Sequence, residues 1–162
     1  MIFRGRRLDL TGTTACASFS FRKTARAVTR LYDLAFQDFG MRSTQFTLLV
    51  GIAKTQPTAI GALGELLILD RTTLTRSLRL LEKEGLISIS KRSRMRQRFL
   101  SLTAKGERVL ARSLPAWRKA HGRFVAAVGP QYWGNIRRDL ERLTQVALRL
   151  EGPQPMQLAQ KH

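Results

Sequence analysis

Arginine and threonine recur over one short segment, where their spacing suits contact with nucleic acid. The segment presents Arg71, Thr72, Thr73, Thr75, Arg76 and Arg79. An arginine can donate two hydrogen bonds to O6 and N7 of guanine, and a threonine can bond a base edge and touch the thymine methyl group. Leu74, Leu78 and Leu81 lie between them at helical spacing. The pattern predicts a helix whose front fits the major groove of DNA; the alternative is a solvated amphipathic surface.

A second group of cations follows this segment. Residues 86–90 and 99–102 alternate between apolar and polar and predict two strands, with Phe99 pointing inward. Five of the eight connecting residues are basic and none is acidic: Lys91, Arg92, Arg94, Arg96 and Arg98. A narrow minor groove attracts arginine, and the remaining cations can contact phosphates. The hairpin is therefore predicted to be a DNA-binding wing; the alternative is a charged edge that resists aggregation.

The charge of the whole chain favours a polyanionic partner. Its 162 residues include 29 Lys and Arg against 11 Asp and Glu, a formal net charge of +18. Such an excess promotes binding to nucleic acid or to an anionic membrane. The predicted reading surfaces lack the exposed aromatic residues typical of RNA binding, and no terminal helix has the large apolar face of a membrane-surface helix. The charge leaves open a protein that coats DNA without sequence preference.

Other function classes lack the residues that they need. There is no nucleophile–base signature, phosphate-binding glycine loop or acid pair, so the chain is predicted not to be an enzyme. With two histidines and one cysteine, neither a zinc site nor a disulfide framework is expected, and no cofactor is implied. No secretory signal is recognisable and no apolar run is long enough to span a bilayer. These features predict a cytoplasmic protein associated with the nucleoid.

Helical spacing predicts the elements that surround the reading helix. Helical periods cover residues 15–39, 43–53, 59–67, 70–84, 104–128 and 131–150. Ser43, Asp70 and Thr103 are the expected N-caps, because their side-chain oxygens can accept hydrogen bonds from the first turn. Gly40 and Gly85 are the expected helix ends.

Proline and glycine mark the expected interruptions. A turn is predicted at Pro57 and Thr58, and a kink or break at Pro115 because proline removes a helical hydrogen bond. Residues 1–14 read as a flexible basic arm, and residues 152–162 as a disordered tail.

Three stretches in register carry a family resemblance. They are residues 25–49 with Leu31-Tyr32 and Gly40-Met41-Arg42-Ser43-Thr44-Gln45-Phe46, residues 70–87 with Asp70-Arg71-Thr72-Thr73-Leu74-Thr75-Arg76, and residues 100–106 with Leu100-Ser101-Leu102-Thr103-Ala104-Lys105-Gly106. The first stretch resembles the first helix and the following turn of the MarR (multiple-antibiotic-resistance regulator) family. The second resembles the family's recognition helix and the start of its wing, and the third resembles the return strand of the wing and the start of the next helix. The resemblance covers nearly all of residues 15–150.

The resemblance implies a homodimeric transcription regulator that reads two half-sites of a pseudopalindromic operator in double-stranded DNA. It places Thr75 and Arg76 at base-reading positions and Arg96 at the position of the family's wing arginine. The usual role is repression that a small molecule or an oxidant releases. Lys91 and Arg94 stand where the family's wing usually carries acids, so the salt bridge that steadies the wing arginine is not expected here.

The resemblance also implies an effector pocket between the dimer helices and the winged domain. Its candidate residues are Tyr32, Phe36, Phe46, Trp117 and His121, although aromatic residues at helical spacing are also typical of a core. Cys16 is a candidate redox residue, because the nearby cations Arg22 and Lys23 favour a thiolate. The chain has no second cysteine to resolve a sulfenate, and an inert small side chain is the alternative.

These observations predict a mainly α fold with a small β-hairpin wing. Residues 41–103 would form a winged helix-turn-helix DNA-binding domain, and residues 15–40 and 104–151 a helical dimerisation region. The predicted function is a dimeric, sequence-specific repressor; the alternative is a non-specific, architectural DNA-binding protein.

Overall fold

The computed structural model describes residues 2–3, 6–7, 9–91 and 97–152. Its helices are α1 (Ala17–Ala35), α2 (Ser43–Thr55), α3 (Ile60–Leu67), α4 (Arg71–Lys83), α5 (Ala104–Val128) and α6 (Pro130–Glu151). Strands β3 (Thr58–Ala59), β4 (Ile87–Lys91) and β5 (Arg98–Leu102) form an antiparallel sheet in the order β3-β5-β4. The predicted fold class, a mainly α winged helix-turn-helix with a small β-hairpin, is confirmed.

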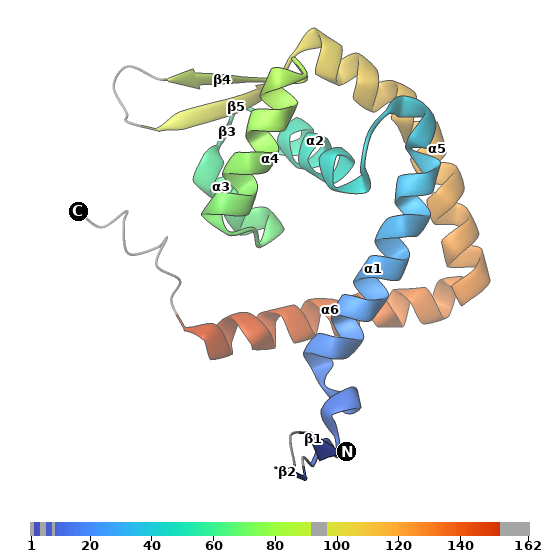
Figure 1. Ribbon diagram of the computed structural model, residues 1–162. Helices are drawn as coiled ribbons and strands as arrows, with labels where there is room; N and C mark the ends of the chain where they lie inside the picture. Colours follow the sequence, from blue (N-terminus) through green and yellow to red (C-terminus); the bar gives the residue numbers. More distant parts are fainter. Residues whose placement is uncertain (1, 4–5, 8, 92–96, 153–162) are drawn as a thin grey trace.

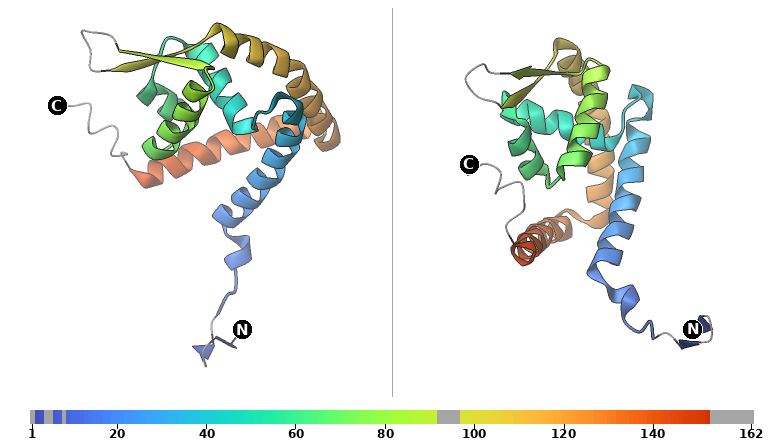
Figure 2. Two further views of the ribbon diagram at one scale, coloured as in Figure 1. Left: turned by 45° about the horizontal axis from the view of Figure 1, so that its top comes forward. Right: turned by 60° about the vertical axis from the view of Figure 1, so that its left-hand side comes forward.

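The elements form a lobe and, around it, a frame that consists of helices α1, α5 and α6 (Figures 1 and 2). Helices α2, α3 and α4 and the sheet make up the lobe, from which the β4–β5 hairpin projects. Helix α5 leaves the sheet and follows the outer edge of the molecule, and α6 turns back beneath the lobe. Helix α1 packs against both α2 and α5. The frame is therefore joined to the lobe through α1 and α5.

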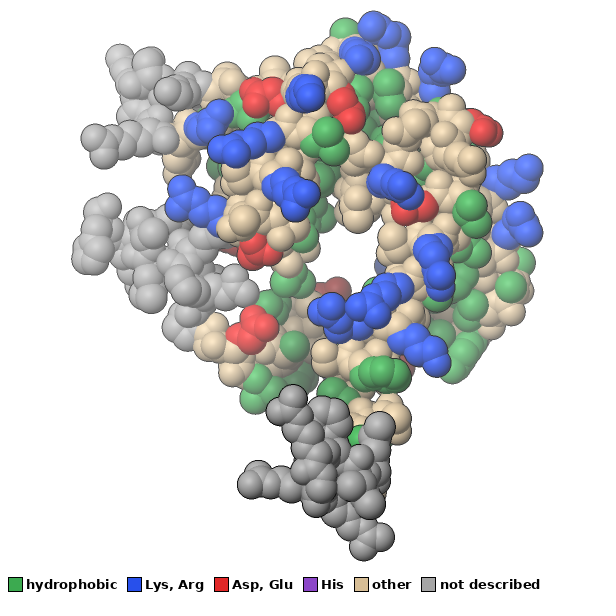
Figure 3. Space-filling model, viewed as in Figure 1, with side chains coloured by type: hydrophobic (Ala, Val, Ile, Leu, Met, Phe, Trp, Pro, Cys, Tyr) green, Lys and Arg blue, Asp and Glu red, His purple; other side chains and the backbone are tan. Residues whose placement is uncertain are grey.

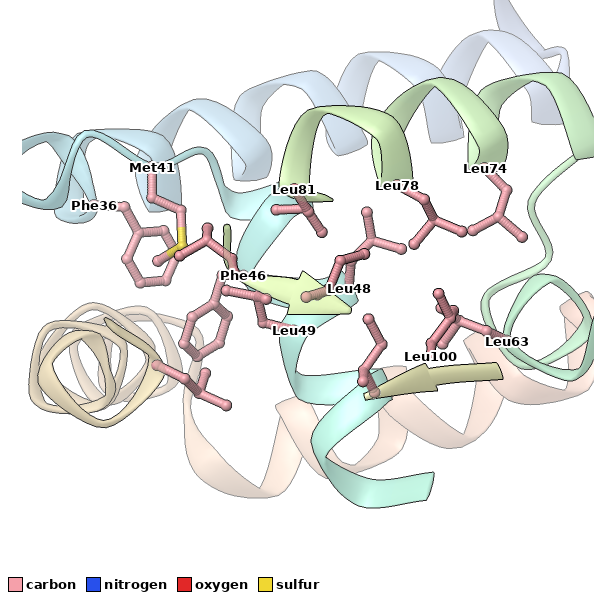
Figure 4. Close-up of a cluster of buried hydrophobic side chains, with 14 residues drawn as sticks. Phe36, Met41, Phe46, Leu48, Leu49, Leu63, Leu74, Leu78, Leu81 and Leu100 are labelled. Atoms are coloured by element: carbon pink, nitrogen blue, oxygen red, sulfur yellow. The ribbon is translucent and has the colours of Figure 1, made fainter. Parts of the chain in front are cut away.

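The hydrophobic core lies in the lobe and at its junction with the frame. Its buried side chains are Phe36, Met41, Phe46, Leu48, Leu49, Ile52, Leu63, Leu74, Leu78, Leu81, Leu86, Ile87, Leu100 and Leu110. Figure 4 shows the leucines of α4 directed at those of α2 and α3 and at Leu100. Burial of such side chains is the main stabilising term in folding, so the lobe has a core of its own.

Helices α1 and α6 have no buried residue, although both carry large apolar side chains. The exposed ones are Phe19, Phe21, Leu31 and Leu34 on α1 and Tyr132, Leu140, Leu143, Val146 and Leu150 on α6. Those of α6 fall on one face at helical spacing, and an exposed apolar face of this kind marks an interaction site. Within the described residues, no helix is both long and apolar enough to cross a membrane.

Several sequence predictions of local structure need correction. Of the kink or break predicted at Pro115, the break does not occur, since α5 runs unbroken from Ala104 to Val128. The N-cap of α2 is Arg42, and Ser43 is the first helical residue. In β5, Leu100 is fully buried and Phe99 only partly, because alternate residues of a strand face opposite sides.

The ends of the chain and the segment after Pro57 contain further differences. Strand β3 directly follows Pro57, where a turn was predicted, and pairs with β5. In the N-terminal arm, β1 (Ile2–Phe3) and β2 (Arg6–Arg7) pair, and a short 3-10 helix covers Thr13–Ala15. Of the predicted disordered tail, residues 153–162 lie outside the described residues.

Candidate nucleic-acid interface

Helix α4 begins at a well-formed cap. The Asp70 side chain accepts hydrogen bonds at 2.9 Å from the backbone N–H groups of Thr72 and Thr73. Hydrogen bonding with the side chain of Thr73, then with its backbone, lowers the pKa of Asp70 below its ordinary value. The carboxylate therefore stays charged next to the positive end of the helix dipole. The predicted cap at Asp70 is confirmed, and Gly85 follows the last turn with a positive φ of 68°.

The two faces of α4 divide as the sequence predicts. Leu74, Leu78 and Leu81 are buried against the core, so the helix cannot rotate about its axis (Figure 4). Of the predicted reading residues, Thr75 is half-buried, and the exposed ones are Arg71, Thr72, Thr73, Arg76 and Arg79. The front of α4 thus presents three guanidinium groups and three hydroxyl groups from one rigid element.

The hairpin beside α4 is formed by β4 and β5, with Lys91 opposite Arg98 at its outer end. Ile87 and Leu100 anchor the base of the hairpin in the core. The predicted wing residues Arg92, Arg94 and Arg96 lie outside the described residues. Figure 3 shows Lys and Arg side chains over α4 and the adjacent base of the hairpin on one face of the molecule.

A polar network links α1, α2 and α4. Asp33 of α1 accepts hydrogen bonds from the Ser43 backbone N–H at 2.7 Å and from its hydroxyl at 2.8 Å, and pairs with Arg42 at 3.3 Å. Gln45 then donates from Nε2 to Glu84 at 3.2 Å, at the end of α4. The network holds the start of α2 between the frame and the reading helix.

The hydrogen bonds of this network hold Asp33 in its charged form. Burial by itself would raise the pKa of the Asp33 carboxyl, but the hydrogen bonds from Ser43 and Arg42 outweigh it, so the pKa lies below its ordinary value. The long-range cap that Asp33 gives α2 was missed by the sequence prediction, because residues 33 and 43 lie on different helices.

Four of the five candidate effector residues line one cavity between α1, α2 and α5. The cavity has a volume of about 550 Å³. Its lining residues are Val28, Thr29, Tyr32, Phe36, Ser43, Thr44, Phe46, Thr47, Val50, Lys54, Leu114 and Trp117. Among the described residues that line the cavity, Lys54 alone carries a positive charge, and none is an Asp or a Glu. The sequence prediction missed Lys54 and the serine and threonine residues of the lining.

The fifth candidate, His121, lies behind the cavity wall. Its Nδ1 is 3.0 Å from the hydroxyl oxygen of Tyr32, and its ring stacks on Trp117 with centroids 5.0 Å apart. Trp133 of α6 approaches the same imidazole edge-on at 6.4 Å. Burial raises the pKa of Tyr32, which keeps its hydroxyl protonated. An aromatic cluster therefore joins the cavity to α6.

Cys16 is exposed and directly precedes α1. It is not grouped with the cavity residues. Among the residues that the structure describes, no group of three or more His, Cys, Asp or Glu side chains is placed to hold a metal ion.

Comparison with known proteins assigns the family. A sequence model of the MarR family matches residues 41–94, from the start of α2 into the hairpin. The structure is similar to the M. tuberculosis transcriptional regulator MosR in complex with DNA, with a TM-score of 0.75 and 33% sequence identity over 82% of this chain and 96% of that one. The chain therefore belongs to the MarR family of transcriptional regulators, as the resemblance predicted.

More distant structures agree in fold alone. The E. coli MarR variant solved with operator DNA has a TM-score of 0.75 at 17% identity, covering 84% of this chain and 99% of that one. The repressor CouR, solved on a 23-mer duplex, has a TM-score of 0.70 at 19% identity, covering 88% of this chain and all 100% of that one. Among curated proteins, none matches the chain.

Proposed function

We propose that this chain is a homodimeric, sequence-specific DNA-binding regulator of transcription in the cytoplasm, with duplex DNA as its partner and no catalytic activity. The observation that carries the proposal is the front of α4, which presents Arg71, Arg76 and Arg79 beside a basic hairpin. The MosR relative was solved with DNA, which supports the same partner for this chain.

Each part of the interface is assigned a role from its chemistry. Arg76 and Thr75 read base edges in the major groove, while Arg71 and Arg79 contact bases or backbone beside them. In the wing, Arg96 enters the minor groove, and the neighbouring cations contact phosphates. Five such phosphate contacts would give a salt slope of roughly −4.5, at about 0.9 per phosphate.

The dimer is inferred from the uncovered apolar faces of the frame. Leu34, Tyr132 and Leu150 are 72%, 63% and 83% exposed in the isolated chain. A second copy that covers these faces makes residues 15–40 and 104–151 a dimerisation region and leaves residues 41–103 as the DNA-binding domain. A two-fold axis then produces two half-sites about one helical turn apart.

The cavity next to Tyr32 is assigned to a small effector that releases DNA. Its stacked aromatic residues, Phe36, Phe46 and Trp117, fit a flat ring. Lys54 supplies a positive charge that favours a carboxylate or phenolate on that ring. Since residues from α1, α2 and α5 line the cavity, a ligand that wedges between them changes the angle between lobe and frame. The regulator would then act as a repressor.

Oxidation of Cys16 is a second candidate for effector control. The thiol is exposed directly before α1, so an oxidant can reach it. Alkylation of the native protein measures its reactivity. A rate well above that of free cysteine supports this route, and an ordinary rate leaves the cavity as the regulatory site.

Selection of bound sequences from a random DNA pool tests the DNA-binding proposal. We expect a two-fold symmetric site that binds at least about 10³-fold more tightly than random duplex at physiological salt. Arg76→Ala should remove this preference and spare much of the salt-dependent background, whereas Arg118→Ala on α5 makes the same charge change and should preserve the preference. A protein that binds every duplex equally would instead be the non-specific coating protein that its charge of +18 also favours.

A further inference from the structure

Helix α1 carries a basic stripe outside the reading helix and the wing. The stripe consists of Arg22, Lys23, Arg26 and Arg30, and all four side chains are exposed. At about 100° per residue they fall within one arc of roughly 100° on the helix. No acid occurs between residues 10 and 32, and none of the four cations forms an ion pair with another described residue. The charge of Arg22, Lys23 and Arg26 is therefore uncompensated, whereas Arg30 lines a hollow together with Asp33.

The packing of α1 fixes the direction in which the stripe faces. Val28 and Tyr32 lie on another side of the helix and line the cavity with Trp117 of α5. Tyr32 is also held by its hydrogen bond to His121. Since the inner side of α1 is held in this way, the cations face outward from the single chain.

The stripe shares a face of the molecule with the reading helix. In Figure 3, Lys and Arg side chains gather over α4 and again along α1, on either side of a hollow, in a single view. Asp and Glu side chains also lie on this face, but Lys and Arg outnumber them. Clustered like charges repel each other, and a polyanion that crosses this face removes that repulsion.

We propose that the α1 stripe binds backbone phosphates of the same duplex that α4 reads. This inference rests on the proposed function and extends the contact surface beyond the winged domain. Arg22, Arg26 and Arg30 follow one another at about 6 Å along the helix axis. A DNA strand carries one phosphate per about 3.4 Å of its axis, so each cation can meet a different phosphate. The stripe contributes affinity and salt dependence but no base preference, since phosphates carry no sequence information.

The test compares two double variants with equal charge loss. Arg22→Gln with Arg26→Gln neutralises part of the stripe, and Arg108→Gln with Arg112→Gln neutralises an exposed pair of the same spacing on α5. Affinity for the selected operator and for random duplex is measured as a function of salt concentration. Circular dichroism and sedimentation establish that both variants remain folded and dimeric.

We expect the stripe variant to flatten the salt slope by at least about 1 unit, and by roughly 3.6 units if all four altered side chains of a dimer touch phosphate. The ratio of specific to random affinity should not change. The α5 variant should keep the slope of the original protein. Equal slopes for the two variants overturn the inference while the proposed function stands.

Chemical footprinting provides an independent readout without substitution. Acetylation of Lys23 should slow when the operator is bound, whereas Lys119 on α5 should react at the same rate with and without DNA. Unchanged reactivity of Lys23 contradicts the stripe contact. If the original chain finds no preferred duplex at all, the proposed function fails, and this inference fails with it.

Discussion

The winged lobe and the helical frame differ in what they bury. The lobe encloses leucines from α2, α3, α4 and β5 in one cluster, whereas α1 and α6 carry comparable apolar side chains and bury none. The lobe is therefore a domain whose stability comes from its own chain. The frame is only complete when a second surface covers it, so its stability is expected to depend on protein concentration.

The test with the largest expected effect on stability replaces one leucine in each region by alanine. Leu81→Ala removes a fully buried side chain from the lobe and should lower the free energy of unfolding by about 2–5 kcal/mol. Leu143→Ala removes an exposed side chain from α6 and should weaken the dimer instead. Denaturant unfolding and sedimentation at several protein concentrations separate the two effects. An unchanged dimer dissociation constant for Leu143→Ala would place the interface elsewhere.

Two glycines of α5 make the same comparison within one helix. A Cβ on Gly106 would collide with the backbone carbonyl of Leu86, so Gly106→Ala should cost about 1–3 kcal/mol. A Cβ on Gly122 meets nothing within 4 Å, and alanine there should add about 0.5–1 kcal/mol through helix propensity. Thermal unfolding of both variants measures the signs. A destabilising Gly122→Ala would show that the partner's backbone packs closely at this position.

The sequence predicted the lobe better than its connections to the frame because the lobe's signals are local. Asp70, the three buried leucines of α4 and Gly85 lie within one helix and its two ends, so helical period and capping chemistry were sufficient. Two-residue strand β3 has no such signal, since it exists only through pairing with β5, some 40 residues later in the chain. The turn residues at Pro57 and Thr58 were recognised, but their pairing was not.

The candidate site shows the same division. Reading residues on α4 follow from a single helix, whereas the cavity combines side chains from three helices. Aromatic residues such as Phe46 and Trp117 were identifiable by type, but Lys54 had no feature that distinguished it from other surface lysines. Of the kink or break predicted at Pro115, the break does not occur because the packed helix α5 tolerates one missing hydrogen bond, which sequence rules cannot weigh against tertiary contacts.

A smaller effect is expected at the joint between the two regions. Asp33→Asn retains the shape of the side chain but loses its charge-assisted hydrogen bonds to Ser43 and Arg42, at a cost of about 1 kcal/mol at neutral pH. Because folding lowers the pKa of Asp33, its contribution is fully present above the ordinary aspartate pKa of 3.8 and is lost as the pH falls through the folded pKa. The stability difference between variant and original should therefore shrink in acid.

Unfolding free energies from pH 7 to pH 3 measure this change, with Asp38→Asn, in the short 3-10 helix Gln37–Phe39 after α1, as the control for loss of an exposed charge. A difference that stays constant with pH would mean that the Asp33 carboxylate does not stabilise the joint through its charge. A difference that grows in acid would have the wrong sign for a carboxyl group with a lowered pKa.

An effect of similar size but opposite sign is expected at Ile68, where the lobe stores backbone strain. Ile68 ends α3 with φ 52° and ψ 48°, a left-handed conformation that a β-branched residue rarely adopts. Its side chain is 51% exposed, so little packing is lost on removal. Ile68→Gly should therefore raise the free energy of unfolding by about 1 kcal/mol, as is typical for glycine after a helix end. Leu66→Gly, inside the last turn of the same helix, should lower it by a similar amount. Thermal unfolding measures the change in stability of both variants. The two changes have opposite signs if the strain lies in the backbone of Ile68. They have the same sign if the exposed side chain of Ile68 makes a contact that outweighs the strain.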